Sequence, residues 1–429
     1  MSGENLSKLR TGELAGSKRL DLSCGLTEFP REIFDLADTL EMLNLSGNRL
    51  AELPDDLARL KKLRILFCSD NDFTHLPAVL GDCPELGMIG FKANRIDTVA
   101  EGALPESVRW LILTDNRIGR LPGSIGRCVK LRKLMLAGNR LETLPEEMAA
   151  CVNLELIRLA ANRFTEFPEW LFELPRLSWL GLGGNPWSET QAADETAMAE
   201  VDWQHLEISH VLGEGASGVI HHAHWHAEPV AVKIFKGTVT SDGLPASEMA
   251  ASLAAGAHDN LIRVLGKISN HPDGRNGLVM SLIDADFTNL AGPPDFETCT
   301  RDVYDEGESF DPAQVISMAF LLASVAAQLH ERRIMHGDFY AHNVLRNGQG
   351  NCLLGDFGAA FFYPEGAGLE GIEVRAFGCL LEELLERCDT GDNDTRLWDL
   401  QKRCMTEYVR ARPGFGEIRD ELKCLLEAD

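Results

Sequence analysis

Apolar residues in the first half of the chain recur with a spacing that is neither helical nor strictly alternating. The unit is L-x-x-L-x-L-x-x-N, in which three apolar positions precede an asparagine. Clear copies are Leu40-Leu43-Leu45-Asn48, Leu63-Leu66-Cys68-Asn71, Leu86-Ile89-Phe91-Asn94 and Leu177-Leu180-Leu182-Asn185. The asparagines stand at Asn48, Asn71, Asn94, Asn116, Asn139, Asn162 and Asn185, so that successive units have nearly equal lengths. This regularity predicts a repeat architecture.

One such unit is too short to bury its own apolar face, so neighbouring units must stack into a curved solenoid. Each unit is expected to contain a short strand whose leucines point inward, and an asparagine that satisfies backbone groups where the chain leaves the strand. A degenerate first unit places Leu20 and Leu22 in frame. The pattern resembles the leucine-rich-repeat family over residues 17–187, which predicts an α/β leucine-rich-repeat solenoid domain over residues 1–187.

The strand positions between the leucines are expected to face the concave side of the solenoid. Large apolar residues are frequent there, at Met42, Ile65, Met88, Trp110, Leu156 and Trp179, with Lys133 in the same row and Phe67, Ile112 and Met135 two positions further on. Some of these side chains could pack beneath loops or neighbouring side chains. A large exposed apolar patch is also typical of an interaction surface. The sequence therefore predicts a protein partner on the concave face, either another protein or the second domain of this chain.

The repeat frame ends at a polar, alanine-rich and acidic stretch. Residues 188–204 are interpreted as a linker or a short bridging helix, and a different pattern begins at residue 205. The run from Val211 to Val219 contains Gly213, Gly215 and Gly218 and is interpreted as a G-x-G-x-x-G-x-V loop between two strands. Such glycines let backbone N–H groups approach phosphates. Taken alone, the loop could equally be a glycine-rich hairpin.

Three further motifs follow in order. Lys233 occupies the lysine position of a V-A-V-K strand, and Glu248 lies beyond it in an alanine-rich stretch that should be helical. His336-Gly337-Asp338 is followed by Asn343, at the fifth position after Asp338. Asp356 then opens an Asp-Phe-Gly motif. The four ordered motifs resemble the protein-kinase family over residues 205–425, which implies an α+β two-lobed domain over residues 205–429.

The resemblance also implies roles for particular residues. Asp338 would orient and deprotonate an acceptor hydroxyl, and Lys233 and Glu248 would form an ion pair that holds the phosphates of ATP. Asn343 and Asp356 would ligate Mg²⁺. The nucleotide would further contact Leu212, Gly213, Gly215, Gly218, Val219, Ala231, Met280 and Leu282, with Val219 and Ala231 on the two sides of the adenine. His336 would support the catalytic loop, and Glu373 would brace it.

The sequence departs from the kinase pattern at several positions. Gly337 replaces the arginine of H-R-D, so a phosphorylated activation loop has no evident partner there. Tyr340 stands where serine/threonine kinases usually have a lysine that contacts phosphate, and His342 is a candidate to replace that lysine in part. The stretch between Gly358 and Glu373 is very short. A short activation segment offers a small platform for a peptide substrate.

The preferred interpretation is an ATP- and magnesium-dependent protein kinase, serine/threonine-directed, whose repeats select its partners. Two alternatives remain open at this point. The same catalytic motifs occur in kinases that phosphorylate small-molecule hydroxyl groups, and a domain with these motifs could serve as an ATP-binding scaffold without turnover.

Composition bears on the binding partners, the cellular location and the state of the cysteines. The net charge of −25 argues against general nucleic-acid binding, because phosphate neutralisation requires clustered lysine and arginine. The eleven cysteines form no C-x-x-C pair and are expected to be reduced and mostly buried. No apolar run is expected to span a membrane, and no leader is recognised, so a cytoplasmic location is expected. His222, His224 and His226 alternate along one strand and are interpreted as a solvated face or, alternatively, as metal ligands.

Overall fold

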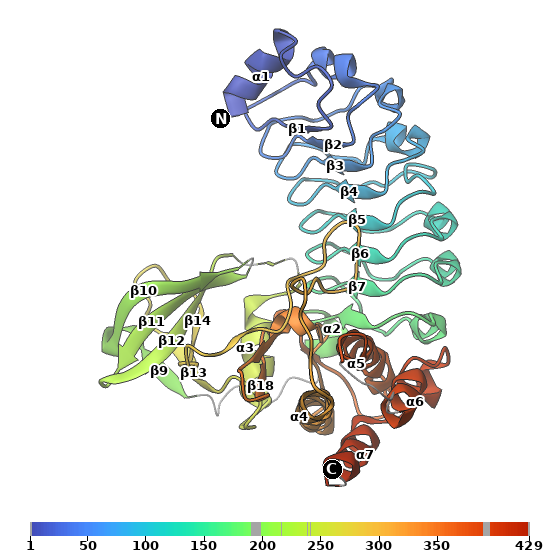
Figure 1. The fold of residues 1–429 in the computed structure, drawn as a ribbon. Helices are drawn as coiled ribbons and strands as arrows, with labels where there is room; N and C mark the ends of the chain where they lie inside the picture. The colour runs from blue at the N-terminus through green and yellow to red at the C-terminus, as the bar shows by residue number, and fades with distance from the viewer. Residues whose placement is uncertain are drawn as a thin grey trace. The chain divides into compact units, whose positions relative to one another are not determined.

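The computed structural model describes residues 2–189, 199–215, 217–237, 239–240, 242–388 and 395–427. The chain divides into two compact units (Figure 1). The first comprises residues 1–157 and 162–176, and the second comprises residues 158–161 and 177–429. Part of the last two repeats therefore belongs to the second unit.

The repeats form one parallel sheet whose strands follow the order of the chain. The strands are β1 (Arg19–Asp21), β2 (Met42–Asn44), β3 (Ile65–Phe67), β4 (Met88–Gly90), β5 (Trp110–Ile112), β6 (Lys133–Met135), β7 (Leu156–Arg158) and β8 (Trp179–Gly181). The central residue of each strand is buried, as at Leu43, Leu66 and Leu134. The predicted leucine-rich-repeat solenoid is confirmed.

Short helices return the chain from one strand to the next. A proline precedes most of the 3-10 helices, which span Arg31–Leu36, Leu57–Arg59, Ala78–Asp82, Gly123–Arg127, Glu146–Ala150 and Glu169–Glu173. Proline suits the position before a helical turn because its fixed φ is compatible with the turn and its missing N–H is not needed there. The first unit begins with α1 (Ser2–Arg10).

The repeat asparagines bond to the backbone as predicted. The Asn71 amide nitrogen donates to the carbonyl oxygens of Leu45 and Cys68 at 2.9 and 3.2 Å, and its Oδ1 accepts from the Leu50 N–H at 2.9 Å. Asn71 is buried, so these bonds satisfy backbone groups that water does not reach. The same pattern joins consecutive repeats along the first unit.

The third positions of the repeats form the predicted row. Met42, Ile65, Met88, Trp110 and Lys133 are direct partners across β2 to β6. The Lys133 ammonium lies 4.1 Å from the centre of the Trp110 ring, which is a cation–π contact. Met88, Lys133 and Leu156 are buried, whereas Met42, Ile65 and Trp110 are half-buried, so only part of the predicted row is open at the surface.

The second unit contains a six-stranded sheet with the order β10-β11-β12-β14-β13-β9. Its strands are β9 (Glu200–Asp202), β10 (Leu206–Glu214), β11 (Gly218–Trp225), β12 (Glu228–Phe235), β13 (Val264–Ser269) and β14 (Gly277–Ser281). One face of the sheet packs a core that includes Val201, Val232, Ile234 and Val279. The helix α3 (Pro245–Ala254) follows β12 along the chain.

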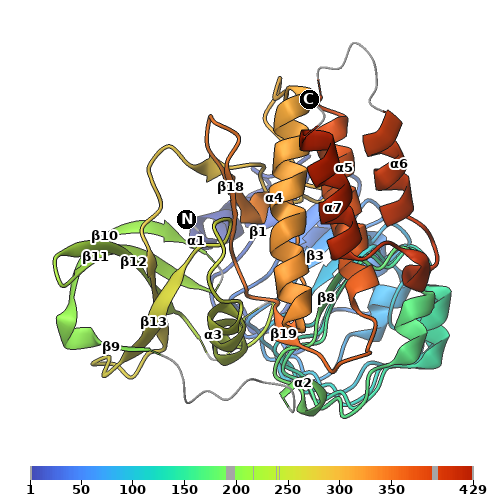
Figure 2. The ribbon, with the colours of Figure 1, turned by 90° about the horizontal axis from the view of Figure 1, so that it is seen from below.

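The remainder of the second unit is mostly helical. Its helices are α4 (Pro312–Glu331), α5 (Glu370–Leu385), α6 (Thr395–Cys404) and α7 (Phe415–Leu426), and α2 (Pro186–Glu189) closes the last repeat. Figure 2 shows α4 and α7 side by side. The small strands are β15 (Thr288–Asn289), β16 (Ile334–Met335), β17 (Val344–Arg346), β18 (Cys352–Leu354) and β19 (Phe361–Phe362). The predicted two-lobed α+β domain is confirmed.

Helix α4 begins at a capping box. The Asp311 side chain accepts from the Gln314 N–H at 2.8 Å, and the Gln314 side chain accepts from the Asp311 N–H at 3.1 Å, which completes a capping box. Contrary to the expectation from the sequence, this 20-residue helix is long and apolar enough to cross a membrane by length and composition alone. Its buried residues, such as Val315, Leu322 and Leu329, are those of a core helix, and 56% of the apolar window is buried.

The predicted linker is shorter than its expected bounds. Residues 190–198 lie outside the described residues, but Glu200–Asp202 forms β9, which pairs in parallel with β13 through partners such as Val201 and Ile268. Val201 is buried in the sheet core. A polar, acidic stretch can still supply one apolar residue to a sheet edge, and periodicity cannot detect so short a strand.

Candidate active site

The central lysine lies on β12 and faces a carboxylate from α3. The Lys233 ammonium forms a buried ion pair with Glu248 and lies 3.9 Å from an Asp356 carboxylate oxygen. Burial raises the pKa of Glu248 to about 7, and the Lys233 charge opposes this rise while Asp356 and Asp242 add to it. A fixed cation beside a second, more exposed carboxylate is suited to holding a polyphosphate with its metal ion.

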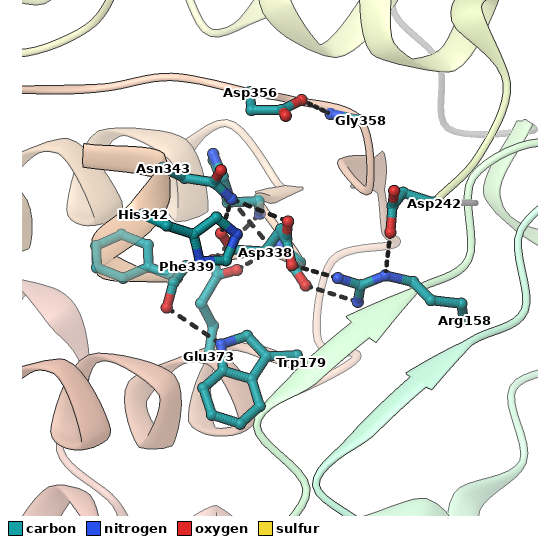
Figure 3. Close-up of polar contacts among 12 residues, drawn as sticks. Arg158, Trp179, Asp242, Asp338, Phe339, His342, Asn343, Asp356, Gly358 and Glu373 are labelled. Atoms are coloured by element: carbon teal, nitrogen blue, oxygen red, sulfur yellow. Dashed lines mark hydrogen bonds and ion pairs between the residues drawn. The ribbon is translucent and has the colours of Figure 1, made fainter. Parts of the chain in front are cut away.

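Asp338 lies on the loop that follows β16. The amide nitrogen of Asn343 donates to both the carbonyl oxygen and the carboxylate Oδ2 of Asp338, each at 2.9 Å. The Asp338 side chain is 17% exposed, so it remains accessible to an acceptor group. Figure 3 shows this carboxylate with Asn343 on one side and an arginine on the other.

Asp356 is brought to the same place by the short ladder between β17 and β18. The Gly355 N–H donates to the Asn343 carbonyl oxygen at 3.0 Å, which sets the residue before Asp356 directly beside Asn343. Asp356 has a φ of 51° and accepts from the Gly358 N–H at 3.2 Å. Its side chain is half exposed, so a carboxylate oxygen is available to a ligand.

Two further predictions about the loop are confirmed. The Glu373 carboxylate accepts from the Gly337 N–H at 2.6 Å, from the His336 N–H at 3.2 Å and from His330 at 2.8 Å. Burial alone would raise the pKa of Glu373, but the hydrogen bond and charge of His330 hold it below its ordinary value. His336 is fully buried, and its Nε2 lies 2.9 Å from the Gly355 carbonyl oxygen. It therefore supports the loop rather than reacting.

The strand register corrects one predicted nucleotide contact. Ile220 is the direct partner of Lys233, and His222 is the partner of Ala231, whereas Val219 is the partner of Ile234. Cross-strand partners share a face of the sheet, so Ile220 lies on the face of Lys233 and Ala231, and Val219 lies on the opposite, core-packed face. The spacing of the glycine motif could have revealed this, because its last position falls on Ile220 when counted from Gly218.

The other predicted nucleotide contacts lie along this face or at its rim. Met280 is the cross-strand partner of Ala231, and Leu282 follows the end of β14. Leu212 and Gly213 lie on β10, where Leu212 is 47% exposed. A β-carbon at Gly218 would lie 2.6 Å from the Ile234 carbonyl oxygen, whereas Gly213 and Gly215 have open space beside them. Gly218 is therefore needed for sheet packing, and the other two leave room above the loop.

An arginine from the repeats contacts the catalytic loop, which the motifs did not predict. Arg158, at the end of β7, forms an ion pair with the Asp338 carboxylate and donates from Nη1 to the Gly337 carbonyl oxygen at 3.0 Å. Its Nε lies 3.0 Å from an Asp242 carboxylate oxygen. The Arg158 side chain is only 1% exposed. No sequence motif marks this residue, because its position in the repeat frame prescribes no particular side chain.

The Trp179 side chain, on the repeat strand β8, is also buried against the catalytic loop. Its ring stacks on Tyr340 with the ring centres 4.1 Å apart and 6° between planes, and its Nε1 donates to the Phe339 carbonyl oxygen at 3.1 Å. Trp179 is 1% exposed. Trp179 is therefore not open to another protein, and its contact with the catalytic loop matches the alternative in which this position packs against the second domain of the chain.

Tyr340 and His342 are both engaged by neighbouring residues. Tyr340 is buried against Trp179, and its burial raises the pKa of its hydroxyl well above the ordinary value. His342 Nδ1 lies 2.7 Å from Asp302 Oδ1, and its N–H donates to the other Asp302 oxygen at 3.0 Å. Asp302 therefore fixes the imidazole next to the catalytic loop.

Asp302 also lies beside a buried glutamate on α5. Glu383 accepts from the Asp302 N–H and from the Tyr304 hydroxyl, each at 3.3 Å. Burial raises the pKa of Glu383 to about 8, and the nearby Asp302 charge adds to this. Between about pH 4.5 and 8, Glu383 therefore keeps its proton in the folded chain but loses it in the unfolded chain. The free energy of unfolding should consequently fall as the pH rises through this range.

Glu383→Gln should remove this pH dependence, because glutamine cannot ionise. The variant is expected to match wild type near pH 5 and to be more stable near pH 8, by up to about 1.4 kcal/mol for each unit of raised pKa. Denaturant unfolding at pH 5, 6.5 and 8 measures the difference, with the exposed Glu386→Gln as control. Identical pH dependence in wild type and Glu383→Gln would contradict the prediction.

The histidines of β11 do not assemble a metal site. The His222 ring centre lies 5.1 Å from those of His210 and His224, and His226 lies beyond the strand end with a φ of 50°. Among the described residues, no group of three histidine, cysteine, aspartate or glutamate side chains is placed to hold a metal ion.

Comparison with known proteins agrees with this geometry. Residues 206–365 match the family of protein tyrosine and serine/threonine kinases, residues 129–186 match the leucine-rich-repeat family, and residues 38–78 match a pair of leucine-rich repeats. The chain therefore combines leucine-rich repeats with a C-terminal protein-kinase domain. The proteins to which the chain is similar include serine/threonine kinases named mos.

The chicken (Gallus gallus) serine/threonine-protein kinase mos is 27% identical over 197 residues, covering 43% of this chain and 56% of that protein. The rat (Rattus norvegicus) proto-oncogene serine/threonine-protein kinase mos is 26% identical over 190 residues, covering 42% and 54%, respectively. The chain thus spans about half the length of these relatives. A leucine-rich-repeat protein of Leptospira interrogans shares 32% identity, with 41% of this chain and 45% of that chain covered and a TM-score of 0.39.

Proposed function

We propose that this protein is a protein kinase that uses ATP and Mg²⁺ to phosphorylate serine or threonine hydroxyls. The observation that carries the proposal is the arrangement of charged groups on neighbouring strands and loops of the second unit. Lys233 is paired with Glu248 and lies 3.9 Å from Asp356, while Asp338 is bonded to Asn343. Phosphoryl transfer depends mainly on positioning and charge neutralisation, which this arrangement supplies.

The donor set suits a magnesium ion. Mg²⁺ prefers hard oxygen ligands, and Asp356 and Asn343 can offer a carboxylate and an amide oxygen. The Asn343 amide nitrogen is turned to Asp338, which leaves its amide oxygen for another partner. The ion, when bound, would neutralise the phosphates of ATP.

The chain's own residues divide the remaining work. Lys233, held by Glu248, would bind the phosphates, and the face of Ile220, Ala231 and Met280 would bind the adenine. Asp338 would accept the hydroxyl proton of the substrate and orient its oxygen toward the terminal phosphate. Glu373 keeps the loop that carries Asp338 in place through bonds to two backbone N–H groups.

The repeat face of the first unit is proposed to bind a protein substrate or regulator. The support is the row of half-buried Met42, Ile65 and Trp110, which lie in one register across β2, β3 and β5. Aromatic and long apolar side chains are typical of interaction hot spots. Trp110 remains available for this role, whereas Trp179 is used by the catalytic unit.

The direct test is transfer of labelled phosphate from γ-labelled ATP by the purified full-length chain. Three acceptors are offered in parallel: generic protein substrates, the chain itself and small-molecule alcohols. Label on serine or threonine is the expected result. Label only on small alcohols, or nucleotide binding without transfer to any acceptor, would overturn the proposal in favour of a small-molecule kinase or an ATP-binding scaffold.

Removal of divalent metal should abolish the transfer. With EDTA in excess of Mg²⁺, incorporation of label is expected to fall to background, and added Mg²⁺ should restore it, because Asp356 is itself an anion and only a metal ion bound to it would neutralise the phosphate charge. Thermal unfolding measured in the same buffers controls for loss of structure. Undiminished transfer without divalent metal would contradict the assignment of Asn343 and Asp356.

A further inference from the structure

Arg158 connects three separate segments of the second unit. It lies at the end of the repeat strand β7, yet its guanidinium contacts the carboxylates of Asp338 and Asp242 (Figure 3). It also donates to the Gly337 carbonyl oxygen. Asp242 precedes α3, the helix that carries Glu248. One arginine therefore links the catalytic loop to the segment that leads into the ion-paired helix.

The Arg158 guanidinium is buried, and its positive charge is paired with two carboxylates. The Arg158 side chain is 1% exposed, and although burial would lower its pKa, Asp338 and Asp242 hold the pKa above the ordinary value. A buried arginine that bonds two carboxylates and a carbonyl oxygen is fixed in one orientation. It thereby fixes the groups to which it donates.

The arginine does not saturate Asp338. An ionised carboxylate offers about four lone-pair sites. Among the described contacts Arg158 bonds Oδ1 and Asn343 bonds Oδ2, and the Asp338 side chain remains 17% exposed. Acceptor capacity is thus left for a substrate hydroxyl, so the contact orients Asp338 without occupying it fully.

A neighbouring repeat strand adds a second support to the same loop. Trp179 of β8 donates to the Phe339 carbonyl oxygen and stacks on Tyr340, so contacts from two repeat strands hold Asp338 and the residues that follow it. Because Tyr340 stands where serine/threonine kinases usually have a lysine, the catalytic loop carries no positive charge at this position. Arg158 supplies a cation at Asp338 from outside the loop.

We propose that Arg158 is a positioning residue for phosphoryl transfer, contributed to the kinase active site by the leucine-rich repeats. It holds the Asp338 carboxylate in its working orientation and couples the catalytic loop to the segment before α3. This inference rests on the proposed kinase function. It makes the end of the repeat region part of the catalytic domain and not merely a module for partner selection.

The test compares Arg158→Met and Arg158→Lys with wild type in the full-length chain. Methionine keeps the apolar stem without the charge, and lysine keeps the charge but concentrates its donors on one nitrogen, so it cannot reproduce the planar fork that reaches three separate partners. Arg158→Met is expected to lower kcat by about 10²-fold, because misplacement of a catalytic group by about 1 Å has that effect, while the KM for ATP stays within about threefold. Arg158→Lys should recover part of the lost kcat.

The matched control is Arg163→Met, an exposed arginine later in the same repeat. Arg158→Met leaves Asp338 and Asp242 without their shared cation, so its folding is checked by thermal unfolding and circular dichroism. If it does not fold, Arg158→Lys and the double variant Arg158→Met/Asp242→Asn carry the comparison, and each should show a reduced kcat.

Three results would overturn the inference. A kcat equal to wild type in every folded Arg158 variant would show that the contact has no catalytic role. A raised kcat would show that Arg158 blocks Asp338 instead of orienting it. A raised KM for ATP with unchanged kcat would assign Arg158 to nucleotide binding. Absence of transfer by wild type itself would instead refute the proposed kinase function, on which this inference depends.

Discussion

Asp338→Asn is expected to reduce phosphate transfer by about 10²–10⁴-fold, the usual contribution of a positioned acid–base group. Asparagine has the same shape but carries no charge, so it cannot accept the hydroxyl proton. The bond from Asn343 and the loop geometry can persist, since Asn343 also donates to the Asp338 backbone oxygen. The loss should appear in kcat, and because the variant also removes one of the two carboxylates paired with buried Arg158, its thermal unfolding is measured in parallel.

The measurement is the initial rate of labelled transfer at saturating ATP, with nucleotide binding followed by calorimetry. Asp305→Asn, an exposed aspartate in the same unit, serves as control. ATP affinity should change little in Asp338→Asn, because the phosphates are assigned to Lys233 and the metal site. A rate within tenfold of wild type would remove Asp338 from the catalytic role.

Gly337→Ala is expected to destabilise the protein by about 2–5 kcal/mol and to inactivate it, because two costs add. A β-carbon at this position would overlap the Leu180 carbonyl oxygen and lie 2.8 Å from that of Ala359. The residue also has a φ of 74°, which costs a non-glycine residue about 1–2 kcal/mol, and overpacking adds about 1–3 kcal/mol. Gly337→Arg, which restores the arginine of H-R-D, should be worse still.

Two other glycines separate these causes. Gly366 has a φ of 78° with open space beside it, so Gly366→Ala reports the backbone strain alone. Gly348 has open space and no positive φ, so Gly348→Ala should be close to neutral. Thermal unfolding of the three alanine variants should rank Gly337 as the most destabilised, then Gly366, then Gly348. Equal melting temperatures for Gly337→Ala and wild type would refute the close packing of β8 on the loop.

The close packing explains a departure that the sequence left unexplained. Gly337 stands where the kinase pattern has an arginine, and the space for that side chain is taken by the backbone of β8. A repeat arginine, Arg158, then reaches the same loop from another direction. The missing arginine is therefore a consequence of how the last repeat packs and not a sign of a lost active site.

The repeat architecture and the catalytic motifs could be predicted because their signals are local. Each repeat frame predicts one strand and the turn that follows it. The frames therefore predict the strands β2 to β8 and the backbone hydrogen bonds of Asn71. The kinase motifs likewise place their charged residues at fixed points on strands and loops. The pairing of Lys233 with Glu248 follows from a strand and a helix that are neighbours in the chain.

Register and short strands were less predictable. The glycine motif predicts Val219 on the nucleotide face, but a shift of one residue along a strand reverses the face, and Ile220 is the cross-strand partner of Lys233. β9 was included in the linker because so short a strand carries no detectable periodicity. Both errors concern the pairing and register of a strand with its neighbour, which local composition determines only weakly.

Sequence periodicity and motif order were thus sufficient for the two folds and their order along the chain, and they indicated the residues for which catalytic roles are proposed. The contacts of Arg158 and Trp179 with the catalytic loop could not be inferred in this way, since they join residues 160 or more positions apart. Such contacts depend on how two surfaces pack together in the folded chain, and a local sequence pattern holds no information about a surface formed by distant residues. For that reason, the same tryptophan that looked like part of an open binding face is buried against Tyr340.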